Sequence, residues 1–256
     1  MPKAVDLNTD AGESFGRGVL VDEGQLFRYV TSANIACGFH AGDPVSIWRS
    51  VRTAKSLGVA VGAHPGFPDL MGFGRREMSL APEELRSYVI YQLGALESFL
   101  RVEGMRMQHV KAHGALYNMA WVRGDYARAL AEAVHSYDPK LILVAPYGSA
   151  MARAAEELGL RVAFEGFIDR GYTSDGRLAP RGTPGALITD IDRVLERVVS
   201  IVDKGVVISV DGRPVEVRAH TLCIHGDSPG AIEIARAVNQ KLREIGVELK
   251  PLSLVV

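Results

Sequence analysis

Short apolar runs alternate with longer segments of helical periodicity along the chain, and this alternation constrains the fold more than any other feature. Strands that alternate with helices through short links form βαβ units and a parallel sheet. We therefore predict an α/β fold of about seven parallel strands, a distorted or incomplete (β/α) barrel that forms one domain over residues 1–256. A doubly wound open sheet is the alternative. The strand-length runs cover residues 5–10, 33–38, 59–64, 108–112, 141–145, 162–166 and 221–224.

Residues 206–217 depart from this alternation. Two short extended runs flank Asp211-Gly212, a dipeptide typical of the type I′ turn in a β-hairpin. Pro214 lacks a backbone donor and suits only an edge strand. We therefore predict a peripheral hairpin outside the main sheet.

The composition argues against several classes of protein. The 256 residues carry a formal net charge of −1, which does not favour nucleic acid or an anionic membrane surface. Neither the phosphate-binding loop Gly-x-x-x-x-Gly-Lys-Ser/Thr nor the dinucleotide motif Gly-x-Gly-x-x-Gly occurs. We expect neither a secretory signal nor a membrane span, because no basic segment followed by an apolar run opens the sequence and no apolar run approaches ~18 residues. Because both cysteines lie in apolar runs, we expect a reducing, cytoplasmic location.

The inward faces of the predicted strands are unusual. Strand side chains alternate between two faces, and here one face is apolar in nearly every strand while the other is polar or small. A barrel interior is normally filled by branched apolar side chains, and buried charges are costly unless they are paired or hydrated. We therefore predict a water-accessible site inside the barrel. The polar set comprises Asp6, Asn8, Asp10, Asn34, His64, Lys111, His113, Glu165, Thr221, Cys223 and His225.

Four of these residues suggest specific chemistry. Asp10, His64 and His113 lie at three strand ends, and a carboxylate with two imidazoles can bind a divalent metal that keeps open positions for water. An acid/base cluster without metal is the alternative. Lys111 could stabilise an oxyanion or a phosphoryl group, or it could form a buried ion pair with Asp6 or Asp10.

The loops add further candidates. Glu13 and Asp69 could act as acid/base groups or could simply cap their loops. Arg75 lies in the glycine-rich loop 65–76 and suits a carboxylate or phosphate, whereas we expect Arg76 to be surface charge. Residues 225–227 precede a predicted helix, where an anion could bind. The remaining polar residues of these runs are expected to be core, structural or exposed: Cys37, His109, His135 and His220.

Several of these motifs resemble those of the LamB/YcsF family. The matching segments are residues 6–13, 33–43, 62–76 and 113–118, and Asp169-Arg170 with His225-Gly226-Asp227 extends the match to nearly the whole chain. Ala112 departs from the family pattern, in which proline is expected. Since Ala112 belongs to the outward set, the difference leaves the candidate chemistry intact.

The resemblance implies a distorted (β/α) barrel similar to the glycoside hydrolase/deacetylase group. It also implies ATP-dependent opening of 5-oxoproline to L-glutamate, with Mg²⁺-ATP handled by or with separate B and C subunits of 5-oxoprolinase. Residues and resemblance together suggest catalytic roles for Asp10, Glu13, His40, His64, Lys111 and His113. They suggest substrate contacts for Asn8, Asp69, Arg75, Asn118, Glu165, Arg170, His225 and Asp227.

Two other functions stay open at this point. The chain could be a metal-dependent carbohydrate deacetylase that acts alone, as the barrel and the Asp/His/His set would allow. It could instead be a non-catalytic subunit whose pocket only binds the substrate. Whether the chain also associates with copies of itself is left open.

Overall fold

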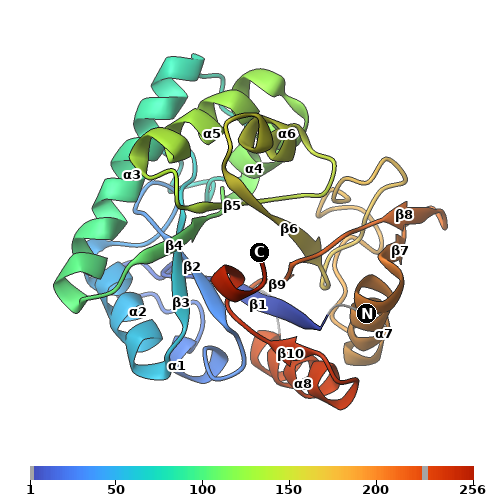
Figure 1. Ribbon diagram of the computed structural model, residues 1–256. Helices are drawn as coiled ribbons and strands as arrows, with labels where there is room; N and C mark the ends of the chain where they lie inside the picture. Colours follow the sequence, from blue (N-terminus) through green and yellow to red (C-terminus); the bar gives the residue numbers. More distant parts are fainter. Residues whose placement is uncertain (1–2, 227–229) are drawn as a thin grey trace.

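Seven parallel strands close into a barrel in the computed structural model, which describes residues 3–226 and 230–256 (Figure 1). Each strand pairs with the next in sequence order, and the last pairs with both β6 and β1. The predicted barrel is confirmed, and it is closed rather than incomplete. The strands are β1 (Ala4–Ala11), β2 (Ser32–Ala36), β3 (Ala60–His64), β4 (Met107–Val110), β5 (Ile142–Ala145), β6 (Arg161–Phe167) and β9 (Thr221–Ile224).

Helices surround the barrel and cover its outward apolar residues (Figure 1). In α3 the buried residues Leu85, Val89, Leu93, Leu96 and Leu100 recur at helical spacing. None of the helices in the described ranges is long and apolar enough to cross a membrane. The helices are α1 (Glu23–Leu26), α2 (Pro44–Leu57), α3 (Pro82–Glu103), α4 (Gly114–Val122), α5 (Gly124–Tyr137), α6 (Ala150–Glu157), α7 (Ile191–Lys204) and α8 (Ala231–Glu244).

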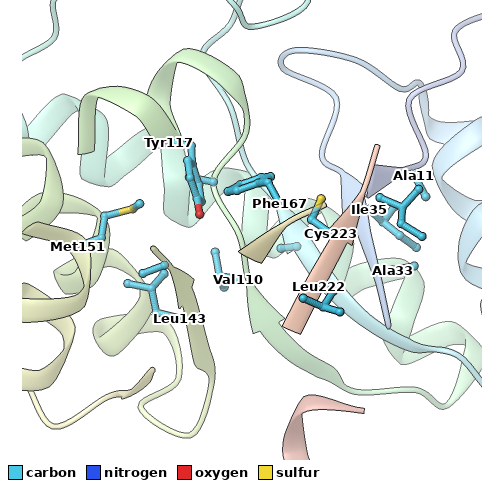
Figure 2. Packing of buried hydrophobic residues seen from close by; sticks show 14 of the residues in the cluster. Ala11, Ala33, Ile35, Val110, Tyr117, Leu143, Met151, Phe167, Leu222 and Cys223 are labelled. Atoms are coloured by element: carbon cyan, nitrogen blue, oxygen red, sulfur yellow. The ribbon is translucent and has the colours of Figure 1, made fainter. Parts of the chain in front are cut away.

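The core beneath these helices is continuous around the barrel. Figure 2 shows Leu143 of β5 near Met151 of α6, and Tyr117 of α4 beside Phe167 of β6. The rings of Tyr117 and Phe167 meet edge to face with centroids 5.8 Å apart. The aromatic pair therefore joins α4, which follows β4, to the strand on the far side of β5.

The peripheral hairpin is formed by β7 (Val206–Ile208) and β8 (Pro214–Glu216), which pair only with each other. The predicted type I′ turn is wrong, because that turn needs positive φ at both central residues. Here Gly212 donates to the carbonyl of Ser209, Ser209 donates to the carbonyl of Arg213, and among these turn residues only Gly212 has positive φ. The turn is centred one residue earlier than expected, on β-branched Val210, which disfavours positive φ.

The C-terminal segment closes the bottom of the barrel. Strand β10 (Glu248–Leu249) pairs with the N-terminal end of β1, and the short helix η1 (Leu252–Leu254) follows. Leu252 packs inside the ring against Ile142, Val144 and Ala163, where Figure 1 places the C-terminus at the centre of the strands. Any functional opening must therefore lie at the other end.

Candidate functional site

A cavity of about 680 Å³ opens at the carboxyl ends of the strands, where ligands bind in (β/α) barrels. Its floor includes Asp10, Lys111 and His225, and its wall includes residues of α4 and of the long loop between β6 and α7. The lining carries His64 and His113 together with five arginines, Arg75, Arg123, Arg170, Arg177 and Arg181.

Lys111 anchors the floor of this cavity. Its Nζ lies 2.8 Å from Oε1 of Glu165, 3.0 Å from Oδ1 of Asp10 and 3.1 Å from Sγ of Cys223. Burial alone would lower the pKa of Lys111, but the carboxylates of Asp10 and Glu165 outweigh burial and raise it well above its usual range. The ion pair with Asp10 that the sequence left open is formed, and Lys111 stays a cation.

Below Lys111 the barrel interior is a network of buried side chains that hydrogen-bond to one another. Asn34 Nδ2 donates to Oδ1 of Asn8 at 2.7 Å, and His109 Nε2 lies 2.7 Å from Oδ1 of Asn34. Asp6 accepts from the hydroxyl groups of Ser32 and Thr221. These side chains are at most 1% exposed, so the predicted water-accessible interior is wrong at this level. Each polar group there is paired with another side chain.

The network includes His109, which the sequence suggested was structural or exposed. It is fully buried, and the register shift between Val61 and Gly62 of β3 lies beside it. A Cβ at Gly62 would lie 2.2 Å from the His109 ring. The missing side chain of Gly62 therefore makes room for the imidazole, and His109 is structural.

At the rim of the barrel, three histidines and one glutamate converge. We call Glu13, His40, His64 and His113 the rim cluster; one ligand atom from each lies within 4.8 Å of the others. The rings of His40 and His113 stack at 3.7 Å, and His40 Nε2 lies 3.2 Å from Oε1 of Glu13. Burial lowers the pKa of both His40 and His113, and the neighbouring imidazoles lower both further. The rings are therefore neutral bases near pH 7.

Two backbone carbonyls fix the tautomers of the rim histidines. His64 Nδ1 lies 2.7 Å from the carbonyl of Lys111, and His113 Nε2 lies 2.8 Å from the carbonyl of Phe73. A carbonyl only accepts, so these ring nitrogens carry the protons. His113 Nδ1 then carries a lone pair, and it faces His64 Nε2 at 3.0 Å.

This arrangement has the donor chemistry of a divalent-metal site. Imidazole nitrogens and a carboxylate oxygen are the ligands that Zn²⁺ and related ions prefer. In addition, Nδ1 of His40 is the one buried side-chain polar atom without a hydrogen-bond partner within residues 3–226 and 230–256. Asp10 lies on the other side of His64, 3.4 Å from its Nε2, and belongs to a second potential group with Cys223 and His225.

The predicted substrate-binding residues divide into three sets. Asn8 and Glu165 lie buried beneath the floor, while Arg75, Asn118, Arg170 and His225 line the cavity. Asp69 lies outside the cavity, beside a separate hollow, where it pairs with Arg76. Asp227 lies outside the described residues.

Several residues of the site were not expected from the sequence. The Tyr117 hydroxyl donates to Oε2 of Glu165 at 2.9 Å. Asp169 accepts from Nδ1 of His225 at 2.9 Å and from its backbone N–H at 3.0 Å. Asp169 and Tyr117 fall within the segments that resembled a known family. Arg123, Arg177 and Arg181 lie in the cavity wall, and no local pattern in the sequence marks them.

Comparison with known proteins gives matches over nearly the whole chain. The family model of the LamB/YcsF family matches residues 5–256. A relative from Pyrococcus abyssi, named as the A subunit of 5-oxoprolinase, is 53% identical over 248 residues, which are 97% of each chain. A relative of the same name from Thermus thermophilus is 53% identical over 246 residues, covering 96% of this chain and 98% of the relative.

Solved structures agree with the fold. The lactam utilization protein from Thermus thermophilus has a TM-score of 0.91 at 51% identity, over 96% of this chain and 99% of the other. A T48 deacetylase has a TM-score of 0.50 at 14% identity, which shows similarity of fold alone. The barrel described above is therefore shared well beyond close relatives.

Proposed function

The chain belongs to the LamB/YcsF family, and we propose that it is the A subunit of a 5-oxoprolinase, which opens the lactam ring of 5-oxo-L-proline to L-glutamate. One observation supports this most strongly. Relatives that carry the name of this 5-oxoprolinase component share about half of their residues with this chain over nearly its full length. The rim cluster and the cationic cavity provide groups suited to such a reaction.

The chemistry calls for an activated substrate, and we assign the activation to partner B and C subunits that use Mg²⁺-ATP. A five-membered lactam is a poor electrophile, and transfer of the ATP γ-phosphoryl group to its carbonyl oxygen makes the ring carbon attackable. Water then adds to that carbon, the C–N bond breaks, and the nitrogen takes up a proton. The resulting acyl phosphate reacts with a second water to give glutamate and inorganic phosphate. This chain has no nucleotide motif, which fits the division of labour.

In this proposal the rim cluster activates the attacking water. His113 Nδ1 presents an unprotonated nitrogen next to the cavity and can take a proton from water as a general base. If a divalent metal were bound instead, Glu13, His64 and His113, with His40 beside them, would be its ligands, and the metal would make the attacking water more acidic. Asp10 contacts both His64 and Lys111 and so connects the histidines of the rim cluster to the cation at the cavity floor.

Lys111 and the arginines would stabilise negative charge. The Lys111 ammonium at the floor would stabilise the negative charge of the phosphoryl group that the oxygen of the attacked carbon carries. Burial lowers the pKa of Arg170, and the nearby cations Arg181 and Arg75 lower it further. A carboxylate and a phosphoryl group on one ligand would relieve this repulsion. The cavity of about 680 Å³ is roomy for a lactam alone and leaves space for the phosphoryl group.

The decisive experiment is glutamate release from 5-oxoproline and Mg²⁺-ATP by this chain alone, by its two partner subunits alone, and by the mixture. We expect activity only in the mixture, and loss of it when Lys111→Met replaces the native chain. Exposed His135→Ala serves as the control and should retain full activity. Chelator-sensitive deacetylation of a sugar by the isolated chain would support the deacetylase alternative. Unchanged turnover in cavity variants would indicate a binding subunit.

A further inference from the structure

Asp69 suggested a substrate contact from its sequence context, but its position points to another role. We propose that Asp69, with Arg76, is a positioning residue that holds the loop 69–76 so that the Phe73 carbonyl fixes the tautomer of His113. The inference rests on the proposed function only in that His113 belongs to the working site. It deepens that function by explaining how the rim cluster is kept ready for a cation.

The carboxylate of Asp69 fastens both ends of the loop. Its Oδ1 accepts from the Gly72 backbone at 2.9 Å, and Arg76 Nε lies 3.0 Å from both carboxylate oxygens. The Asp69 backbone carbonyl accepts from Gly74 at 2.9 Å. Asp69 is only 6% exposed, and the Arg76 guanidinium lowers its pKa to about 2. The pair is thus charged at any pH at which the protein works.

Phe73 adopts a strained backbone within this loop. Its φ is +54°, and no other non-glycine residue in the described part of the chain has a positive φ. Gly74 follows with a φ of +63°. A left-handed conformation is unfavourable for a bulky residue and persists only where its surroundings impose it. Gly74 cannot be replaced freely, because a Cβ there would lie 2.6 Å from Cβ of His40.

The strained conformation places two carbonyls on the segment that carries His113. The Phe73 carbonyl accepts from His113 Nε2 at 2.8 Å, and the Gly74 carbonyl accepts from the Ala115 backbone at 2.9 Å. The Phe73 ring also meets the His113 ring edge to face, with centroids 5.3 Å apart. The loop therefore contacts both the His113 ring and the backbone that follows His113.

The tautomer decides what the rim cluster can bind. With its proton on Nε2, His113 turns a lone pair toward Nε2 of His64, 3.0 Å away. Without the Phe73 carbonyl, His113 could carry its proton on Nδ1 and donate directly to His64. Nδ1 of His113 would then carry a proton and would offer no lone pair to a cation. The loop prevents this internal hydrogen bond.

The test is the tautomer itself, measured by two-bond ¹⁵N–¹H correlation in the histidine-labelled chain, with His113 assigned from the spectrum of His113→Gln. We expect the Nε2–H form in the native chain and a shift toward Nδ1–H in Asp69→Ala and Arg76→Gln. Asp175→Ala is the matched control, because Asp175 pairs with Arg177 at 2.6 Å in another loop beside the cavity. It should leave the tautomer unchanged.

A second readout is Co²⁺ affinity, which needs neither partner subunits nor turnover. Loss of a residue that orients a metal ligand lowers affinity about 10–100-fold, and we expect a drop of this size in Asp69→Ala and in Arg76→Gln but none in Asp175→Ala. Should Asp69→Ala fail to fold, Arg76→Gln provides the same test. Phe73→Gly, in which positive φ carries no penalty, should keep the tautomer.

Two outcomes would overturn the proposal. The first is an unchanged His113 tautomer with unchanged Co²⁺ affinity in folded Asp69→Ala. The second is a rise in KM for 5-oxoproline in the full complex with no change in tautomer, which would make Asp69 a substrate-binding residue. If the chain has no part in 5-oxoproline cleavage, activity is absent throughout but the tautomer shift in Asp69→Ala remains, so the two failures are distinguishable.

Discussion

His109 and His113 lie four residues apart on one segment, both point into the barrel, and both are at most 4% exposed. Both ring nitrogens of His109 have side-chain partners, Asn34 at 2.7 Å and Gln108 at 3.2 Å. His113 instead has a backbone partner, the Phe73 carbonyl, on Nε2, and its Nδ1 lone pair faces another histidine, His64, at 3.0 Å. The histidine at the base of the barrel therefore has its hydrogen bonds satisfied by neighbouring side chains, whereas the histidine at the rim does not. Burial alone does not tell a structural histidine from a functional one, but hydrogen-bond completeness does.

The largest effect expected from this comparison is the loss of activity in His113→Ala. Removal of a general base or of a ligand next to the attacked carbon should reduce glutamate release by the full complex about 10²–10⁴-fold. Stability should fall less than in His109→Ala, because His113 lies beside the cavity, whereas His109 is fully buried and both of its ring nitrogens have side-chain partners. Activity within a few-fold of the native complex would remove His113 from the mechanism.

His109→Ala should show the opposite balance. It leaves a cavity beside Gly62 and deprives Asn34 of its partner, which together should lower the free energy of unfolding by about 2–4 kcal/mol. Turnover per folded complex should change little, since His109 does not line the cavity. The measurement is denaturant unfolding together with glutamate release. Full stability combined with lost turnover would reverse the roles of the two histidines.

The base also predicts a dependence of stability on pH. Burial raises the pKa of Asp6 from its usual 3.8 to about 6, against the lowering effect of hydrogen bonds from Ser32 and Thr221. The folded state thus binds this proton more tightly than the unfolded state. The stabilisation is complete below pH 4 and is lost as the pH rises through 6, a change of up to ~3 kcal/mol. Asp6→Asn should flatten this part of the unfolding profile measured from pH 4.5 to 7.

At the rim, added metal should stabilise the chain. A divalent ion bound only to the folded state adds about 2.7 kcal/mol when present at 100 times its Kd, so Zn²⁺ or Co²⁺ should raise Tm and a chelator should reverse the rise. Glu13→Gln should abolish the shift, whereas His225→Ala, in the neighbouring potential group, should keep it. The reverse pattern would place the ion between Asp10, Cys223 and His225.

Much of the fold could be predicted because a strand has a period of two and a barrel needs an apolar outer face. Parity alone identified Asp10, His64, Lys111 and His113 as inward residues, and all four line the cavity. Parity could not show how inward residues pair. Whether Lys111 contacts water or Glu165 depends on which strands become neighbours across the ring, and β6 and β1 approach only after closure.

The loop residues were harder to predict. The loop that Asp69 holds contains a left-handed Phe73, a conformation that sequence rules count against for an aromatic residue. The displacement of His109 from a regular ladder follows from the register shift at Val61 and Gly62. The register shift depends on pairing between strands, and the Phe73 carbonyl meets His113 in another segment of the chain, so a local pattern shows neither contact.

The closure of the ring by β1 has a consequence for how the chain folds during synthesis. Residues 4–11 are synthesised well before their partners at 221–224 and 248–249. Until then the nascent chain carries a strand with an unpaired edge. Pairing across more than 200 residues makes final closure a slow step, since such contacts form only after a large loss of chain entropy. A barrel closed in this way therefore needs the unpaired edge of β1 to be protected from wrong pairing until the last strands are synthesised.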